Sequence, residues 1–145
     1  MIRSRTVWLC SSAGISFEKA LPSMRFKSPN SPARIINRHM KNIKLVLEYD
    51  GSDFFGFQRQ PSRMTVQESL EGALSKLLNQ KTKIEAASGR TDTGVHADCQ
   101  VVNFRTKSDL ELRDMQRGLN ALLPKQIAIK GIAEVERSFH ARYHA

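Results

Sequence analysis

The stretch that decides the fold is residues 83–106, KIEAASGRTDTGVHADCQVVNFRT. Its two ends, residues 83–88 and 98–106, read as strands. Between them, residues 89–96 are polar and turn-forming, so they predict a loop rather than a piece of the core. The pattern predicts two antiparallel strands that follow each other directly along the chain. A helix is predicted on either side of this pair.

A strand and a helix are predicted before this stretch. In the sequence IKLVLEYDG, residues 43–51, every second residue from Ile43 to Tyr49 is Ile, Leu or Tyr and faces one side. This period of two predicts a strand, which ends at Asp50-Gly51. Residues 52–62, SDFFGFQRQPS, are a loop with aromatics. In residues 65–80, TVQESLEGALSKLLNQ, Thr65 and Glu68 have the spacing of a capping box. The apolar residues of this helix share one face: Val66, Leu70, Ala73, Leu74 and Leu77.

A second helix and a last strand follow. Asp109 is placed to cap the helix, and Pro124 comes after its end. The helix has an apolar stripe of Leu112, Met115, Leu119 and Leu122. Residues 127–136, IAIKGIAEVE, predict the strand. The order β-α-β-β-α-β is the split βαβ, ferredoxin-like plan. We therefore expect an α+β domain over residues 40–137, a four-stranded antiparallel sheet with both helices on one face.

The charge of the chain is uneven. The net charge is +9 and the pI is near 10.0, a balance that favours an acidic partner such as nucleic acid. Residues 1–39 carry seven of the basic residues and only one acidic residue, so the remainder of the chain is only mildly basic. Composition alone therefore overstates the case for a positive surface on the folded part.

Residues 1–39 differ in character from the rest. They are rich in Ser and Arg, contain three prolines and have no sustained period. They match either an organellar transit peptide or sequence upstream of a true start at Met40. In both cases we expect a disordered extension without stable contacts to the core. Cys10 and Cys99 do not suggest a disulfide framework. We expect a cytoplasmic protein with no membrane association, or an organellar one if the extension is a transit peptide.

Three interpretations compete for Asp92 in the loop GRTDTGVHA. A turn residue is the ordinary role for Asp beside Gly. However, Arg90 lies two residues away, so in an extended segment both side chains project to the same side. The guanidinium would then keep the carboxylate ionised by lowering its pKa, as a nucleophile or base requires.

The second interpretation is an aspartic protease, because Asp92-Thr93-Gly94 matches its tripeptide. Those proteases are all-β, and their paired carboxyls share a proton that a neighbouring arginine would oppose. The third is a metal site at His96, Cys99, His140 and His144. Cys-x-x-Cys pairs are absent, and FHARYHA reads more like a strand than a helix, so solvent-facing or core histidines are favoured.

The motif GRTDTGVHA resembles the signature of the tRNA pseudouridine synthase A family, which usually has Ala where this chain has Thr93. Residues 47–60, LEYDGSDFFGFQRQ, are similar to the first-strand motif of that family, which often has Trp at the position of Phe57. SFHARYHA, residues 138–145, is similar to the block that leads into the family's second half. The helix starting TVQESLEGAL and the stretch LNALLP also match. The resemblance covers about residues 42–145.

The resemblance implies an isomerase that converts uridine to pseudouridine in the anticodon stem-loop of tRNA, at positions 38–40. It implies that Asp92 is the catalytic aspartate and that no metal or organic cofactor is needed. Arg90 would pair with Asp92 or fill the space that the target base vacates. Further RNA-binding candidates are Gln58, Arg59, Arg63 and His96, and Arg105 and Lys107 are additional basic residues that could contact phosphate. Phe54, Phe55 and Phe57 either stack on bases or pack onto the sheet.

The family implies a homodimer with a second ferredoxin-like half, and a tyrosine-containing strand after FHAR. We expect this chain to be a fragment that ends near the start of that half, at residues 138–145, and to have little activity alone. The alternative function is a non-catalytic RNA-binding module that keeps only the fold. An apolar seam on the sheet would favour the synthase, and a sealed polar face would favour the module.

Overall fold

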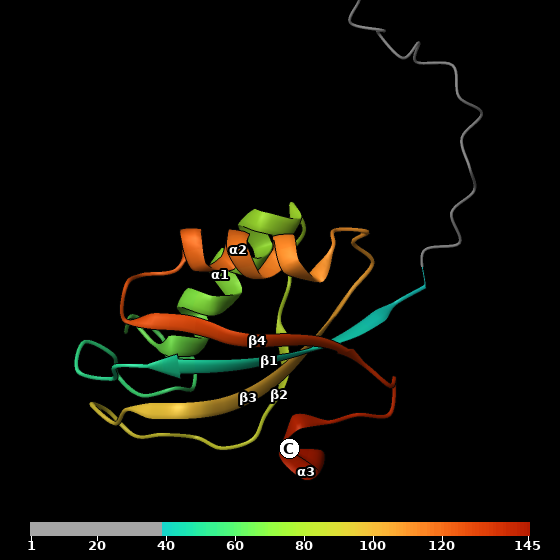
Figure 1. Ribbon diagram of the computed structural model, residues 1–145. Helices are drawn as coiled ribbons and strands as arrows, with labels where there is room; N and C mark the ends of the chain where they lie inside the picture. Colours follow the sequence, from blue (N-terminus) through green and yellow to red (C-terminus); the bar gives the residue numbers. More distant parts are fainter. Residues whose placement is uncertain (1–38) are drawn as a thin grey trace, which may run out of the picture. The chain divides into compact units, whose positions relative to one another are not determined.

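The four-stranded antiparallel sheet expected from the sequence is present. The structure is a computed structural model that describes residues 39–145. The strands are β1 (Lys41–Tyr49), β2 (Ile84–Ala87), β3 (Ala97–Thr106) and β4 (Ile127–Val135). Their spatial order is β2-β3-β1-β4, the arrangement of a ferredoxin-like fold (Figure 1). The prediction of a disordered extension falls outside the described residues except for His39, whose Nδ1 lies 3.3 Å from a guanidinium nitrogen of Arg137.

The helices α1 (Val66–Leu78) and α2 (Leu112–Leu122) cover one face of this sheet, as predicted. Between them and the sheet lies the core. Its fully buried members alternate along β1, as a strand with one covered face requires. The core includes Ile43, Leu45, Leu47, Leu70, Leu74, Val102, Phe104, Met115 and Leu119.

The helix ends agree with the sequence at one site and differ at another. The Thr65 side chain accepts a hydrogen bond from the Glu68 N–H at 3.3 Å, which confirms the predicted N-cap of α1. The predicted cap of α2 at Asp109 is wrong, because α2 begins after Glu111 and has no side-chain cap bond. Hydroxyl groups organise the preceding turn instead. The N–H of Ser108 bonds to Thr106 Oγ1, and the N–H of Leu110 bonds to Ser108 Oγ.

Two further predictions, for the apolar stripe of α2 and for the segment FHARYHA, are wrong. Leu122 is exposed, and Leu123 is buried in its place, because the chain becomes extended at Leu123 and turns that side chain into the core. The segment FHARYHA is not a strand. It contains a short helix, α3 (Ala141–His144), which contacts β2 and β3 on the side of the sheet away from α1 and α2 (Figure 1).

Two loops meet at the end of the sheet where β1 ends and β3 begins. The aromatic loop, residues 50–65, follows β1, and the Asp92 loop, residues 88–96, connects β2 to β3. Phe54 and Phe57 of the aromatic loop are 2% exposed and belong to the core, so packing rather than base stacking explains these two rings. Phe55 remains 39% exposed.

The backbones of these loops are joined directly. The N–H of Phe57 donates to the Thr91 carbonyl at 3.0 Å, and the N–H of Gly94 donates to the Phe54 carbonyl at 3.2 Å. Glycine permits this approach at two positions. A Cβ on Gly51 would collide with the Val95 carbonyl. Gly56 has a positive φ of 82°, and a Cβ there would lie 2.8 Å from the Thr91 carbonyl oxygen.

This geometry predicts that Gly56→Ala destabilises the domain and shifts the Asp92 loop. The new methyl group would meet backbone that cannot easily yield, on a residue whose φ disfavours any side chain. We expect a loss of more than about 1 kcal/mol in the free energy of unfolding. The measurements are urea unfolding and amide chemical shifts of residues 90–95.

Gly72→Ala is the matched control. Gly72 is exposed within α1, and a Cβ there meets no atom within 4 Å. Alanine should therefore stabilise the helix by about 0.5–1 kcal/mol. Equal effects of the two substitutions would contradict the close contact between the loops.

Candidate active site

Asp92 stands in a hollow between the two loops. The Asp92 hollow measures about 370 Å³ and is lined by Phe55, Gly56, Gln58, Gln60, Arg90, Thr91, Asp92 and Thr93. The Asp92 side chain is exposed, and within residues 39–145 no hydrogen bond or ion pair engages its carboxylate. Its backbone is fixed, because the Asp92 carbonyl accepts from the Val95 N–H at 3.2 Å. An unpaired carboxylate on a fixed backbone is free to act as nucleophile or base.

The residue before Asp92 fastens the loop to the core. The Thr91 hydroxyl and the Tyr49 hydroxyl are 2.7 Å apart and hydrogen-bonded. Tyr49 ends β1 and is 4% exposed. Burial raises the pKa of the Tyr49 phenol, and the bond to Thr91 opposes this only in part. Tyr49 therefore keeps its proton at neutral pH, and the bond is not subject to titration there.

Arg90 does not form the expected ion pair with Asp92. In the part of the chain that the structure describes, no carboxylate lies within ion-pair distance of the Arg90 guanidinium. Arg90 instead lines the Asp92 hollow on one side and a second, larger hollow on the other. Gln58 has the same position between the two. The structure thus brings Asp92, Arg90 and Gln58 together.

His96 lies at the far end of the Asp92 loop and outside the Asp92 hollow. Its Nδ1 is 3.0 Å from Asp50 Oδ1 and 3.2 Å from the Gly51 nitrogen, so it joins the loop to the end of β1. Hydrogen bonds from Ser52, and then the His96 ring, hold the pKa of the Asp50 carboxyl below its usual value. His96 lines a different hollow, of about 620 Å³, with Lys125 and Gln126.

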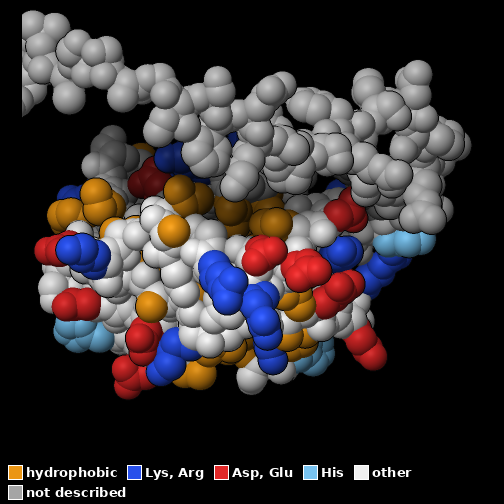
Figure 2. Space-filling model, turned by 45° about the horizontal axis from the view of Figure 1, so that its top comes forward, with side chains coloured by type: hydrophobic (Ala, Val, Ile, Leu, Met, Phe, Trp, Pro, Cys, Tyr) orange, Lys and Arg blue, Asp and Glu red, His pale blue; other side chains and the backbone are white. Residues whose placement is uncertain are grey.

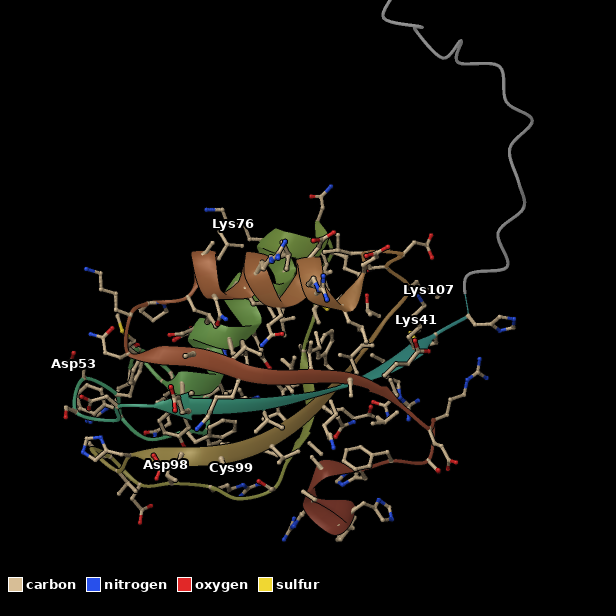
Figure 3. All side chains as sticks on the ribbon, in the orientation of Figure 1. Lys41, Asp53, Lys76, Asp98, Cys99 and Lys107 are labelled. Carbon is tan, nitrogen blue, oxygen red and sulfur yellow. The ribbon has the colours of Figure 1, made fainter. Side chains whose placement is uncertain are left out.

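The remaining basic candidates have varied surroundings. The Arg59 guanidinium contacts Glu71 at 3.1 Å and Glu68 at 3.5 Å, both on α1, so RNA would have to compete with two carboxylates. The Arg63 guanidinium lies over the ring of Phe55, 4.6 Å from its centroid, and Phe55 itself lines the Asp92 hollow. Arg105 pairs with Glu85 at 2.9 Å. Lys107 lies at the opposite end of the sheet from Asp53 of the aromatic loop (Figure 3).

Sequence reasoning missed the second hollow. This side hollow measures about 560 Å³ and is lined by Phe57, Gln58, Gln67, residues 84–90, His140, Arg142 and Tyr143. The last three come from the segment of α3, which was expected to be a strand. The only signal in the sequence for an RNA-binding position here was the adjacent Arg142 and Tyr143. The sequence did not indicate where in the fold they lie.

A buried amide pair holds this segment against the sheet. Asn42 and Asn103 are 1% and 0% exposed, and Asn103 Nδ2 donates to Asn42 Oδ1 at 3.1 Å. Asn42 Nδ2 donates to the carbonyls of Glu136 and Phe139 at 2.9 Å each. The N–H of Ala141 donates to Asn103 Oδ1 at 2.9 Å. Buried amides with these partners fix the position of the chain before α3.

The alternatives for this site are weaker in the structure. Within residues 39–145, no group of three or more His, Cys, Asp or Glu side chains is arranged to hold a metal ion. The N–H of His140 donates to His144 Nδ1 at 3.1 Å, so these two histidines serve the short helix. The helices over one face of the sheet also differ from the all-β aspartic proteases.

Charges of both signs are mixed on one face of the molecule. Figure 2 shows Lys and Arg side chains beside Asp and Glu side chains on the face that it presents. Figure 3 places Asp98 and Cys99 together along β3.

No helix in the described part of the chain is long and apolar enough to cross a membrane.

Comparison with known proteins identifies the family. Residues 45–144 match the family model described as tRNA pseudouridine synthase. Curated relatives named tRNA pseudouridine synthase A include those of Francisella tularensis subsp. mediasiatica, 49% identical over 106 residues, and of Geobacter sp. strain M21, also 49% identical over 106 residues. A relative from Chlorobium luteolum is 50% identical over 107 residues.

The match covers 73% of this chain but 41% of the Francisella relative and 42% of the other two. The chain therefore spans less than half the length of the curated relatives that it matches. The matched region contains all four strands except the first residues of β1, and the whole of both loops around Asp92. The chain belongs to the tRNA pseudouridine synthase family.

Proposed function

We propose that this chain forms the Asp92-bearing half of an enzyme that isomerises uridine to pseudouridine in the anticodon stem-loop of tRNA. The observation that carries the proposal is the unpaired Asp92 carboxylate, which lies in a hollow built by two fixed loops within the region that matches the family. The curated relatives carry the name tRNA pseudouridine synthase A, which supports uridine isomerisation in tRNA.

The reaction requires little besides a positioned carboxylate and a base that can reach it. The bond from the ribose to the ring nitrogen breaks, the base turns, and a bond from the ribose to a ring carbon forms. That carbon loses its proton and the freed ring nitrogen gains one, so the reaction is an isomerisation. Asp92 is the group to act on the ribose or the base, as nucleophile or as base. The target uridine must leave its stack to enter the Asp92 hollow, which costs about a few kcal/mol.

The side of the sheet that faces away from α1 and α2 and carries α3 supports the synthase over a simple RNA-binding module. Val46 of β1, Val101 of β3 and Ala133 of β4 lie on this side and are only half-buried. The register pairs Val46 with Val101 in neighbouring strands, whereas Ala133 pairs with Lys44, so an apolar pair of valines lies next to polar side chains on this side. Beside this pair of valines, Glu48 and Lys130 form an ion pair at 3.0 Å.

By resemblance to the family, we propose that the full-length protein is a homodimer.

The direct test of Asp92 is Asp92→Asn in a chimera. Residues 45–144 would replace the matching part of the Geobacter relative, and pseudouridine would be measured in tRNA anticodon stem-loops. The amide is nearly isosteric with the carboxylate but cannot attack or accept a proton. We expect turnover to be lost, with affinity for the stem-loop unchanged because phosphate contacts elsewhere supply it.

Asp98→Asn is the control for this substitution. Asp98 is exposed on β3 and lies outside the Asp92 hollow. The same change there should leave turnover intact. Near-normal turnover of Asp92→Asn would return Asp92 to the role of a turn residue.

Arg90→Ala should behave differently from Asp92→Asn. Because Arg90 lines both hollows and has no ion-pair partner in the described part of the chain, its guanidinium is available to RNA phosphate. We expect both weaker stem-loop binding and slower turnover of the chimera. Unchanged binding at low salt would show that Arg90 does not contact the RNA.

A further inference from the structure

The side hollow is an unassigned space next to the candidate active site. It is separated from the Asp92 hollow by the two residues that line both, Gln58 and Arg90. Its volume of about 560 Å³ falls within the range of about 300–1,000 Å³ that is usual for sites that bind small groups. A chain of nucleotides that places one residue at Asp92 can therefore place a neighbour here.

The charge of the side hollow favours an anion. Arg90 and Arg142 line it, and within residues 39–145 neither guanidinium has an ion-pair partner. Glu85 is the single carboxylate in the lining, and its Oε2 is already engaged by Arg105 at 2.9 Å and by Asn103 Nδ2 at 3.4 Å. Guanidinium groups bind phosphate with paired, directional hydrogen bonds.

An exposed aromatic ring on the α3 wall points to a nucleotide rather than a bare anion. The Tyr143 ring stacks on the His140 ring at 4.8 Å between centroids, yet Tyr143 remains 72% exposed. An exposed aromatic ring next to an unpaired guanidinium is the arrangement that stacks a base and holds its phosphate.

The wall is also held in place before any ligand arrives. The Asn42–Asn103 pair fixes the backbone from Glu136 to Ala141, and the Tyr143 N–H donates to the His140 carbonyl at 3.0 Å. A fixed wall loses little conformational freedom on binding.

We propose that the side hollow binds a nucleotide adjacent to the target uridine, with Arg142 on its phosphate and Tyr143 stacked on its base. The proposal rests on the proposed function, since it takes RNA as the substrate. It adds a second binding position that is built by α3 and is separate from the chemistry at Asp92.

The test uses the 145-residue chain and a fluorescently labelled anticodon stem-loop RNA, with dissociation constants measured over a series of salt concentrations. Arg142→Ala should weaken binding on the order of tenfold at low salt and reduce the salt slope by about one unit. Arg113→Ala is the matched control, because Arg113 is exposed on α2, on the opposite side of the sheet. It should change neither quantity.

Tyr143 provides an independent arm. Tyr143→Ala should weaken binding on the order of tenfold through the lost stack, with the salt slope unchanged. The separate variant Tyr143→Phe keeps the ring and should bind with wild-type affinity. A stem-loop series with single neutral methylphosphonate linkages then locates the phosphate. At the linkage next to the target uridine, the neutral RNA should bind wild type and Arg142→Ala equally well.

The outcomes separate this inference from the proposed function. If Arg142→Ala and Arg113→Ala bind the stem-loop with equal affinity and equal salt slope, the proposed nucleotide site in the side hollow is wrong. Pseudouridine formation by the chimera would still support the synthase. An Arg142 effect that couples to one linkage supports the side hollow even if the chimera forms no pseudouridine. Absence of stem-loop binding by the wild-type chain overturns the inference whatever the chimera does.

Discussion

The rest of the site depends on how Thr91 is held. Its carbonyl accepts the Phe57 N–H at 3.0 Å, and its hydroxyl bonds to the buried Tyr49 at 2.7 Å. Phe57 and Tyr49 both belong to the core, so the loop is tied to the most stable part of the domain. Asp92, the next residue, is thereby exposed without being mobile at its backbone. The proposed catalytic role needs a carboxylate that is both unpaired and positioned, and this arrangement provides both.

The sequence predicted the fold well because the strands and helices follow from local patterns of apolar and polar residues. Alternation in β1 and the apolar stripes of the helices follow directly from which face is buried, and Thr65 caps α1 as its spacing indicated. The motif around Asp92 also indicated the site. Glycine beside Asp92 alone favours a turn residue, and it was the spacing of Arg90 and Asp92 and the resemblance of the whole motif that favoured a site; the family match extends through the motif.

What the sequence could not predict depends on tertiary contacts. The absence of an Arg90–Asp92 pair reflects loop geometry that residue spacing does not encode. Asp109 was a reasonable cap, but Thr106 and Ser108 organise that turn and delay the helix to Leu112. The α3 segment is helical against the sheet because Asn42 and Asn103, each far away along the chain, supply its buried partners. No local pattern in FHARYHA contains that information, and the side hollow was missed for the same reason.

The central claim is that the two loops hold each other and thereby position Asp92, and amide hydrogen exchange tests it most directly. The N–H groups of Phe57, Gly94 and Val95 donate to carbonyls of Thr91, Phe54 and Asp92 at 3.0–3.2 Å. If the loops form one unit with the core, these three amides exchange slowly, with protection that follows that of β1 as denaturant is added. Exchange of Phe57 and Gly94 at the rate of an unstructured peptide, while β1 stays protected, would contradict the account.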